Sequence, residues 1–501
     1  MILADKDTTE STGECYSASF LYSGGFHAQA EVDQFNQTRL VIGIDDYDFS
    51  WKLKKGESFS TPEVCLTYSA DGFSKLSQTL HQAIVSNLIR SCWKDRVRPI
   101  LVNNWEATYF DFNKDNLIAI AKEAAELNLD MLVLDDGWFG KRDDDFSGLG
   151  DWFVNEKKLC GTLSELVKEV HDMGLSFGLW FEPEMISEDS DLYRAHPDWA
   201  LVIPGRQPIR SRSQLVLDMS REDVTDYLTE RICDIVEKAD IQYIKWDMNR
   251  SLMAAYSAKL PRDRQGELRH RYVLGLYKVL EAVTQRFPEL LLEGCSGGGG
   301  RFDAGMLYYC PQIWCSDNTD AIERLRIQYG TSFGYPMSSV SAHVSVCPNH
   351  QNHRVTPFKT RGICAMQGTF GYELDLSKMT DEEKKMAGEQ IAFFKEHGRL
   401  FQFGDYYRLT SPFENRDYTV WEYAAQDGSE ACMSVVYTDM YANAASEIVK
   451  WKGLDPKKVY QMQLDGEDAG NFSGAALMHA GILLPLPEQN YDAFQIYLKA
   501  E

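Results

Sequence analysis

Basic residues are in short supply in this 501-residue chain. Its 51 lysines and arginines are outnumbered by 75 aspartates and glutamates, which gives a formal net charge of −24. A protein that binds nucleic acid normally presents a basic face, so the charge balance argues against that class. The negative charge also disfavours docking on anionic lipid. We therefore expect neither nucleic acid nor a membrane as a partner.

The signals of exported and membrane proteins are also missing. No uninterrupted apolar run approaches the ~18 residues that a membrane span needs. The N-terminal sequence MILADKDTTE lacks the basic start and apolar core of a signal peptide. The eleven cysteines are odd in number and contain no CxxC pair, which does not fit a secreted disulfide framework. Reduced thiols and a cytoplasmic location are the expectation.

The middle of the chain alternates apolar, strand-like runs with helical patterns. The runs cover 99–105, 130–138, 175–184, 214–220, 242–248, 290–298, 312–318 and 336–343. Between them, residues such as Leu117, Ile120 and Ala124 recur with the period of a helix. Eight strand–helix units over roughly 250 residues predict a closed (β/α)8 TIM barrel, in the α/β class.

Strand-like runs with turns dominate both flanks of this region. Residues 14 to about 90 are predicted to be β throughout, and the chain after about 404 shows short strands without helices. We therefore predict an N-terminal β-sandwich remnant at 1–92, a catalytic barrel at 93–404 and a C-terminal antiparallel β domain at 405–501.

Most of the eight runs change from aliphatic to polar or aromatic residues where they end. In a TIM barrel these ends meet at the active-site mouth. Tryptophan faces stack on sugar rings, while carboxylates, lysine and asparagine hydrogen-bond hydroxyl groups. A phosphorylated ligand would instead call for arginine, lysine and amide nests. The end residues are Asn104, Trp105, Glu106, Asp135, Asp136, Trp180, Glu182, Glu184, Asp218, Lys245, Asp247, Asn249, Glu293, Cys295 and Asp317.

Two of these carboxylates fit glycoside hydrolysis with retention, in which a nucleophile and an acid/base stand ~5–5.5 Å apart. Asp247, on the fifth run, suits the nucleophile. Lys245 lies two residues earlier on the same side of the strand, where its charge would help to keep Asp247 ionised. Asp317, after the seventh run, suits the acid/base, which needs a raised pKa.

Other polar residues have simpler explanations. An aspartate at a strand end is commonly a helix cap, which is the expectation for Asp218 and Asp320. The GGGG at 297–300 lacks the pattern of a phosphate loop and indicates a close backbone approach or a turn. The residues His343, Cys347, His350 and His353 have zinc-binding side chains in a spacing that matches no common site. Cys295 has no histidine near it in sequence, so lining or packing is favoured over nucleophilic chemistry.

Seven motifs together resemble glycoside hydrolase family 36, the bacterial α-galactosidases. They are NNWEATYFDF, LDDGWFG, GLWFEPEM, QLVLDMSR, IKWDMNR, EGCSGGGGRFD and CSDNTDAIERLRIQYG, in order between about 97 and 405. The resemblance implies a retaining α-galactosidase that acts on α-1,6-linked galactose in melibiose, raffinose and stachyose. It also implies that no metal or other cofactor is needed.

The resemblance assigns roles to individual residues. Asp247 matches the nucleophile and Asp317 the acid/base. Asp135 and Asp136 match the pair that holds the galactose 4- and 6-hydroxyls. Cys295 and Gly298 match residues beside the 2-hydroxyl. The remaining matches are a pocket wall and further sugar-binding positions: Trp105, Trp180, Arg212, Lys245 and Asn249.

The chain departs from the family pattern at its start. Long members carry a β-supersandwich before the barrel, and only its last portion is expected here. Tetramers are common among long members, so the resemblance implies a homo-oligomer. Two other functions stay open: a galactosyltransferase on the same scaffold, or a non-catalytic sugar-binding protein.

Overall fold

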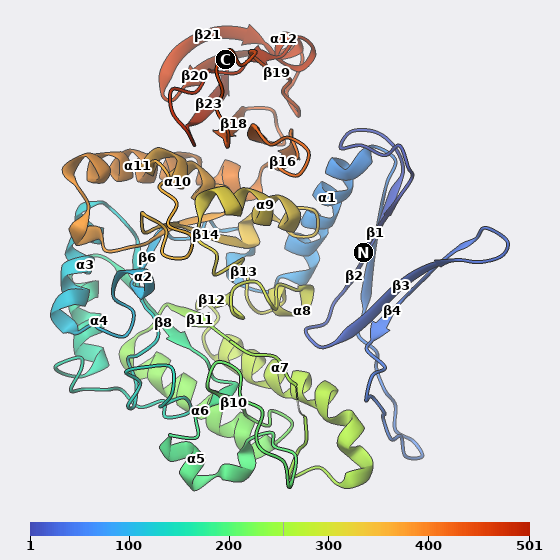
Figure 1. The fold of residues 1–501 in the computed structure, drawn as a ribbon, viewed down its shortest axis with the longest axis vertical. Coiled ribbons are helices and arrows are strands. Elements are labelled where there is room, and N and C mark those ends of the chain that lie inside the picture. The colour runs from blue at the N-terminus through green and yellow to red at the C-terminus, as the bar shows by residue number, and fades with distance from the viewer. Residues whose placement is uncertain (254) are drawn as a thin grey trace.

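A closed barrel of eight parallel strands forms the centre of the molecule (Figure 1). The computed structural model describes every residue except Ala254. The last barrel strand pairs with the first, so the sheet has no open edge. The predicted TIM barrel is therefore confirmed. In order, its strands are β6 (Leu101–Asn103), β7 (Met131–Leu134), β8 (Ser176–Phe181), β11 (Tyr243–Trp246), β12 (Leu291–Gly294), β13 (Gln312–Trp314), β14 (Val340–Ser345) and β15 (Thr369–Glu373).

One of the eight predicted barrel strands is wrong, and one barrel strand was not predicted. The run 214–220 contains only β10 (Leu215–Val216), which pairs antiparallel with β9 (Met185–Ile186) outside the barrel. The missing strand is β15, whose Gly371 weakens the strand signal in the sequence. A Cβ at Gly371 would lie 2.7 Å from the His343 ring, so the glycine allows β15 to pack against β14. Asp247 consequently follows the fourth barrel strand and Asp317 the sixth, not the fifth and seventh.

Helices cover the outside of the barrel as the 3.6-residue period predicts. Helix α3 (Lys114–Glu126) buries Leu117, Ile120 and Ala124, and α7 (Leu268–Arg286) buries Leu276 and Leu280. Burial of each leucine or isoleucine side chain contributes about 1.5–3 kcal/mol. The other helices around the barrel are α2 (Trp105–Thr108), α4 (Leu163–His171), α5 (Asp191–Ala195), α6 (Glu222–Ala239), α8 (Ala304–Leu307), α9 (Ala321–Thr331), α10 (Phe358–Ala365) and α11 (Asp381–Phe403).

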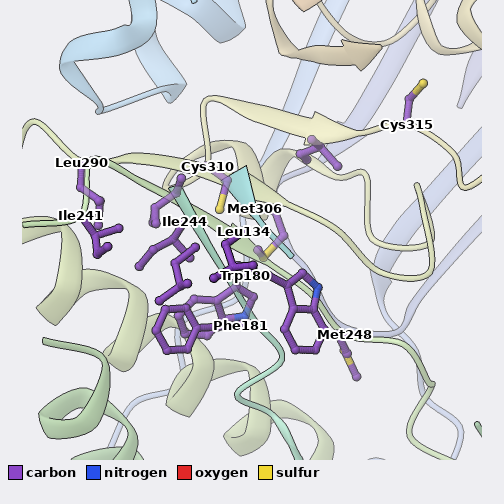
Figure 2. Packing of buried hydrophobic residues seen from close by; sticks show 14 of the residues in the cluster. Leu134, Trp180, Phe181, Ile241, Ile244, Met248, Leu290, Met306, Cys310 and Cys315 are labelled. Atoms are coloured by element: carbon purple, nitrogen blue, oxygen red, sulfur yellow. The ribbon is translucent and has the colours of Figure 1, made fainter. Parts of the chain in front are cut away.

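The barrel strands are buried on both faces, which explains their nearly continuous apolar sequences. Leu134, Phe181 and Ile244 come from β7, β8 and β11 and are all fully buried. Figure 2 shows them packed in one cluster with Trp180. This packing fixes the strand ends, and hence the polar residues that follow them.

Helix caps account for one of the two aspartates to which we assigned that role. Asp320 caps α9, because its carboxylate accepts a hydrogen bond from the Glu323 amide at 2.9 Å. The prediction for Asp218 is wrong: helix α6 begins after Arg221. Asp218 is fully buried and instead accepts hydrogen bonds from the Ser220 amide at 3.1 Å and from the Ser257 hydroxyl.

The N-terminal region contains more helix than the sequence predicts. Strands β1 (Ile2–Ala4), β2 (Cys15–Phe20) and β5 (Val64–Ser69) form an antiparallel sheet, and β3 (Phe26–Val32) pairs with β4 (Thr38–Ile44). Residues 72–88 are helical, as α1 (Gly72–Ala83) and a π-helical turn (Ile84–Leu88). The prediction of β structure to about 90 is wrong there, because Leu76 and Leu80, one helical turn apart, anchor α1 in the core.

A predominantly β region follows the barrel, as predicted, although it also contains one short helix that the sequence patterns did not indicate. Its six-stranded antiparallel sheet has the order β16–β17–β18–β23–β20–β21 and lies beyond α10 and α11 (Figure 1). These strands are β16 (Asp405–Arg408), β17 (Tyr418–Ala424), β18 (Glu430–Tyr437), β20 (Val459–Leu464), β21 (Glu467–Ser473) and β23 (Ala493–Ala500). A short helix, α12 (Gly474–His479), and the small pair β19 (Ile448–Val449) and β22 (Ile482–Leu483) complete it.

Candidate active site

A cavity of about 180 Å³ opens where the barrel strands end. That volume lies below the ~300–1,000 Å³ typical of drug-sized ligands, so it suits one small polar ring. Of the residues to which the resemblance assigns a role, all but Cys295 and Gly298 line it. Four other predicted strand-end residues do not: Asn104, Glu184, Asp218 and Glu293. The lining comprises Trp105, Glu106, Asp135, Asp136, Arg142, Asp145, Trp180, Glu182, Arg212, Gln214, Lys245, Asp247, Asn249, Trp314, Asp317, Thr319, His350, Gln351 and Glu373.

Asp247 is buried and held by several donors at the end of β11. The residue is only 6 % exposed, and its amide donates to the Phe181 carbonyl at 2.8 Å. Its Oδ1 accepts from the Met248 amide at 2.8 Å, while Oδ2 accepts from Asn249 Nδ2 at 2.8 Å and Trp180 Nε1 at 3.2 Å. These donors stabilise a negative carboxylate and fix its orientation.

Asp317 stands in a more open position across the same cavity. The residue is exposed, and Trp314 Nε1 donates to its Oδ1 at 3.1 Å. Loss of solvent around the carboxyl within the cleft raises the pKa of Asp317, and the negative charge of Asp247 raises it further. The cation of Lys245 opposes both effects. The cavity therefore pairs a firmly held carboxylate with an accessible carboxyl that retains its proton more readily.

Gly298 supports Asp317 from behind instead of lining the cavity. Its φ of +84° is in the left-handed region, and an added Cβ would lie 2.6 Å from the Asp317 amide nitrogen. The glycine-rich segment therefore makes a close approach to the chain itself. A larger residue at position 298 would therefore press on the Asp317 backbone without entering the cavity.

Cys295 also lies behind the cavity wall. It follows β12, is 4 % exposed, and its amide donates to the Trp246 carbonyl at 2.7 Å. Burial raises the pKa of the Cys295 thiol well above its usual value, and the charge of Asp247 adds to this. A protonated, buried thiol is a poor nucleophile, which agrees with a packing role.

Lys245 contacts Asp135 directly, not Asp247. Its Nζ lies 2.8 Å from Asp135 Oδ2, which also accepts from Asn103 Nδ2 at 2.7 Å. Burial works to lower the pKa of Lys245, but the charge of Asp135, followed by those of Glu373 and Asp247, raises it well above its usual value. That the Lys245 charge helps to keep Asp247 ionised stays a prediction: the two charges interact, but more weakly than Lys245 interacts with Asp135.

Asp136 has its own cation, Arg142, which the sequence analysis did not identify. Arg142 Nε lies 3.1 Å from both carboxylate oxygens of Asp136, and Nη2 lies 2.8 Å from Oδ2. Burial raises the pKa of Asp136 to about 6, although the Arg142 cation opposes the shift. In the sequence, Arg142 stands in the polar run GKRDDDF, which looks like an ordinary loop. Each acid of the Asp135–Asp136 pair is thus balanced by the protein's own side chains.

Two further glutamates line the cavity where strands at the barrel's closure end. Glu106 follows β6, and its Oε1 accepts from the Thr319 hydroxyl at 2.7 Å. Burial, followed by the charge of Glu373, raises the pKa of Glu106 to about 8. Glu373 ends β15, so the sequence analysis missed it together with its strand. His343 lies 3.4 Å from Glu373 and is not part of a metal cluster; among the described residues, no group of three or more His, Cys, Asp or Glu is placed to hold a metal.

Other structural observations bear on the redox and membrane expectations. All eleven cysteines, which lie in the described part of the chain, are free thiols. Among the helices that the structure describes, none has the length and apolar character required to cross a bilayer.

Comparison with known proteins identifies related sequences along the whole chain. The Melibiase family model matches residues 58–404, and models of the glycosyl hydrolase family 36 N-terminal and C-terminal domains match 1–54 and 418–498. The bifunctional alpha-galactosidase/sucrose kinase AgaSK of Mediterraneibacter gnavus is 54 % identical over 495 residues, which are 99 % of this chain and 52 % of that protein. The chain thus spans about half the length of that relative.

Solved structures match the fold closely. The alpha-galactosidase AgaA of Geobacillus stearothermophilus is 52 % identical over 498 residues, covering 99 % of this chain and 68 % of AgaA. Its crystal structure superposes with a TM-score of 0.98 and covers 100 % of this chain and 69 % of that one. Variants of AgaA have been solved in complex with raffinose, at 51 % identity and a TM-score of 0.97, and with stachyose.

Proposed function

The chain belongs to glycoside hydrolase family 36, and from this premise we propose that it is a retaining α-galactosidase. Its substrates would be oligosaccharides of the melibiose and raffinose type, from which it removes terminal α-1,6-linked galactose. The complexes of AgaA variants with raffinose and stachyose support this substrate class.

The pairing of Asp247 and Asp317 across one cavity is the observation that carries the proposal. In the first step, a carboxylate oxygen of Asp247 attacks the anomeric carbon while the Asp317 carboxyl gives its proton to the departing glycosidic oxygen. A covalent galactosyl-enzyme results. In the second step, Asp317 takes a proton from water, the water oxygen attacks the anomeric carbon, and Asp247 is released.

The environments of the two acids suit these roles. The nucleophile must be a carboxylate in a fixed position, and Asp247 is buried among N–H donors. The acid/base must hold a proton at working pH and reach both the leaving group and water. Asp317 has a raised pKa and lies at an accessible position.

The remaining lining residues supply recognition in this proposal. Asp135 and Asp136 would accept hydrogen bonds from the galactose 4- and 6-hydroxyls, and the axial 4-hydroxyl distinguishes galactose from glucose. Their cations, Lys245 and Arg142, keep the carboxylates oriented. The other sugar contacts proposed are Trp105, Trp180, Arg212, Lys245 and Asn249.

The test is turnover of p-nitrophenyl α-galactoside, melibiose and raffinose by this 501-residue chain. A retaining enzyme releases α-galactose first, which nuclear magnetic resonance detects before the anomers equilibrate. First release of β-galactose would contradict the two-step mechanism. Product analysis with raffinose, with and without excess sucrose, separates hydrolysis from transfer, since dominant transfer at low acceptor concentration would favour a galactosyltransferase.

We further propose that the chain forms a homo-oligomer in the cytoplasm. Each subunit would contain three domains, at 1–92, 93–404 and 405–501. Mass in solution tests the assembly. A monomer with full activity would show that no neighbouring subunit is needed at the cavity.

A further inference from the structure

Glu182 stands beside Asp247 at the ends of neighbouring barrel strands. It follows β8 directly, and β8 pairs in parallel with β11 so that Phe181 is opposite Trp246. The residue is fully buried from outside solvent, yet it lines the cavity. Neither its burial nor its place next to the proposed nucleophile is explained by the two-acid mechanism.

One oxygen of Glu182 holds the segment that orients Asp247. Its Oε1 accepts from the Asn249 amide at 2.5 Å and from Gln214 Nε2 at 2.6 Å. Asn249 in turn donates from Nδ2 to Asp247 Oδ2 at 2.8 Å, and its Oδ1 accepts from Arg212 Nη1 at 2.7 Å. The position of the Asp247 carboxylate therefore depends on Asn249, and the Asn249 backbone depends on Glu182.

The other oxygen of Glu182, Oε2, is buried and has no hydrogen-bond partner among the residues that the structure describes. A second carboxylate here would be a buried, poorly compensated charge next to Asp247, which is costly. The nearby cation, Arg142, is already engaged by Asp136 through Nε and Nη2. Burial, followed by the charge of Asp247, raises the pKa of Glu182 to about 8, against the opposing effects of Asn249, Gln214 and Arg142.

We propose that Glu182 is a positioning residue that remains a neutral carboxylic acid and holds the Asp247–Asn249 segment in its reactive arrangement. Its Oε1 anchors the Asn249 amide, and its proton resides on Oε2, where it prevents a second negative charge beside the nucleophile. The inference rests on the proposed α-galactosidase function and adds a residue that acts on Asp247 through Asn249.

Two substitutions separate the two parts of this role. Glu182→Gln keeps an oxygen acceptor and stays neutral at every pH, so it should retain kcat for p-nitrophenyl α-galactoside within about 10-fold of wild type at pH 6. Glu182→Ala leaves the Asn249 amide without its acceptor. We expect a loss of kcat of about 10- to 100-fold with a smaller change in KM, because only one of the proposed sugar contacts, Asn249, is disturbed while the nucleophile is misplaced.

The pH profile provides a readout that a purely structural role would not change. In wild type, kcat/KM for p-nitrophenyl α-galactoside should fall above about pH 8, where Glu182 ionises. This substrate needs little acid assistance, so loss of the Asp317 proton contributes little to the fall. In Glu182→Gln the decline should be absent or moved to higher pH. If it persists unchanged, another group such as Glu106 causes it, and the inference is wrong.

Glu422→Gln is the matched control. Glu422 is also a fully buried glutamate with a pKa raised well above its usual value, but it lies in β17 of the C-terminal sheet. Its variant should keep both the turnover and the pH profile of wild type. If the wild type is active and Glu182→Ala has the same kcat as wild type, the proposed role of Glu182 is wrong and the proposed enzyme function stands. Absence of turnover in wild type and in the control would overturn both proposals.

Discussion

Gly298 lies so close to Asp317 that a single added methyl group would meet the Asp317 amide nitrogen at 2.6 Å and the Ser316 Cα at 2.8 Å. Both contacts are with backbone, which cannot rotate away as a side chain can. Space for the proposed acid/base thus depends on the absence of a side chain at Gly298.

Gly298→Ala should therefore damage activity more than its size suggests. We expect kcat on raffinose to fall by about 10²-fold, because displacement of a catalytic group by ~1 Å costs that much. The positive φ should add a loss of about 1–3 kcal/mol in the free energy of unfolding. The control is Gly330→Ala: Gly330 lies in α9 with nothing within 4 Å of an added Cβ, so this variant should keep full activity. Equal behaviour of the two variants would contradict the argument.

Asp247→Ala should abolish nearly all turnover. Loss of the nucleophile removes the covalent intermediate, and we expect kcat to fall by roughly 10³-fold or more for every α-galactoside. The measurement is turnover of p-nitrophenyl α-galactoside by the variant and by wild type. Equal rates would remove Asp247 from its proposed role.

Asp317→Ala should show a loss that depends on the leaving group. Raffinose needs a proton on its departing oxygen, whereas p-nitrophenolate leaves readily without one, so kcat/KM should fall much more for raffinose. The raised pKa of Asp317 also means that wild-type kcat/KM on raffinose declines as pH rises through that pKa and the acid form is lost. Equal losses on the two substrates would argue against an acid role.

The Lys245–Asp135 pair should be important to stability as well as to sugar binding. Both side chains are nearly inaccessible, at 6 % and 3 % exposure. Asp135→Ala leaves the Lys245 charge without its direct partner, which should lower the free energy of unfolding by about 3–5 kcal/mol. The double variant Asp135→Ala, Lys245→Met removes the stranded charge and should recover part of that stability, but no activity. Urea unfolding of the three proteins tests this, and an unchanged stability for the single variant would contradict it.

Glu422 should make stability depend on pH. Burial raises its pKa well above the usual value, so the folded state keeps a proton that the unfolded chain releases near pH ~4.3. Its contribution is therefore fully present below that pH and is lost as pH rises toward the folded-state pKa. Glu422→Gln carries no such proton. As pH rises from ~4.3 toward the folded-state pKa of Glu422, the free energy of unfolding of the variant should gain on wild type by about 1.4 kcal/mol per pH unit, and a constant difference would contradict the prediction.

The sequence predicts the site best where an apolar strand run changes to polar or aromatic residues at its end. The apolar runs at β7, β8 and β11 end in Asp135, Trp180 and Asp247, and the barrel brings these ends to one cavity. Order along the chain was less informative for β10 and β15. The two-residue strand β10 lies in an apolar run that looks like a barrel strand in the sequence. Only the pairing with neighbouring strands shows that β15 belongs to the barrel and β10 does not.

Pairings between polar side chains are hard to predict from sequence, whether the partners are near or far along the chain. Arg142 looks like one cation in a charged loop, and nothing in its neighbours indicates that it is 2 % exposed and bound to Asp136. Glu182 was visible as a polar strand end, but its contact with the Asn249 amide depends on how two strands are aligned. Burial and register thus decide which polar residues act together.

The pairing of β15 with β6 also sets an order of events during synthesis. The first barrel strand leaves the ribosome about 270 residues before its final neighbour, since β6 begins at Leu101 and β15 ends at Glu373. Contacts so distant along the chain form slowly. A nascent chain that stops short of β15 leaves edges of β6 and β14 unpaired and lacks Glu373, so the barrel and the lining of its cavity are complete only once that strand has been made.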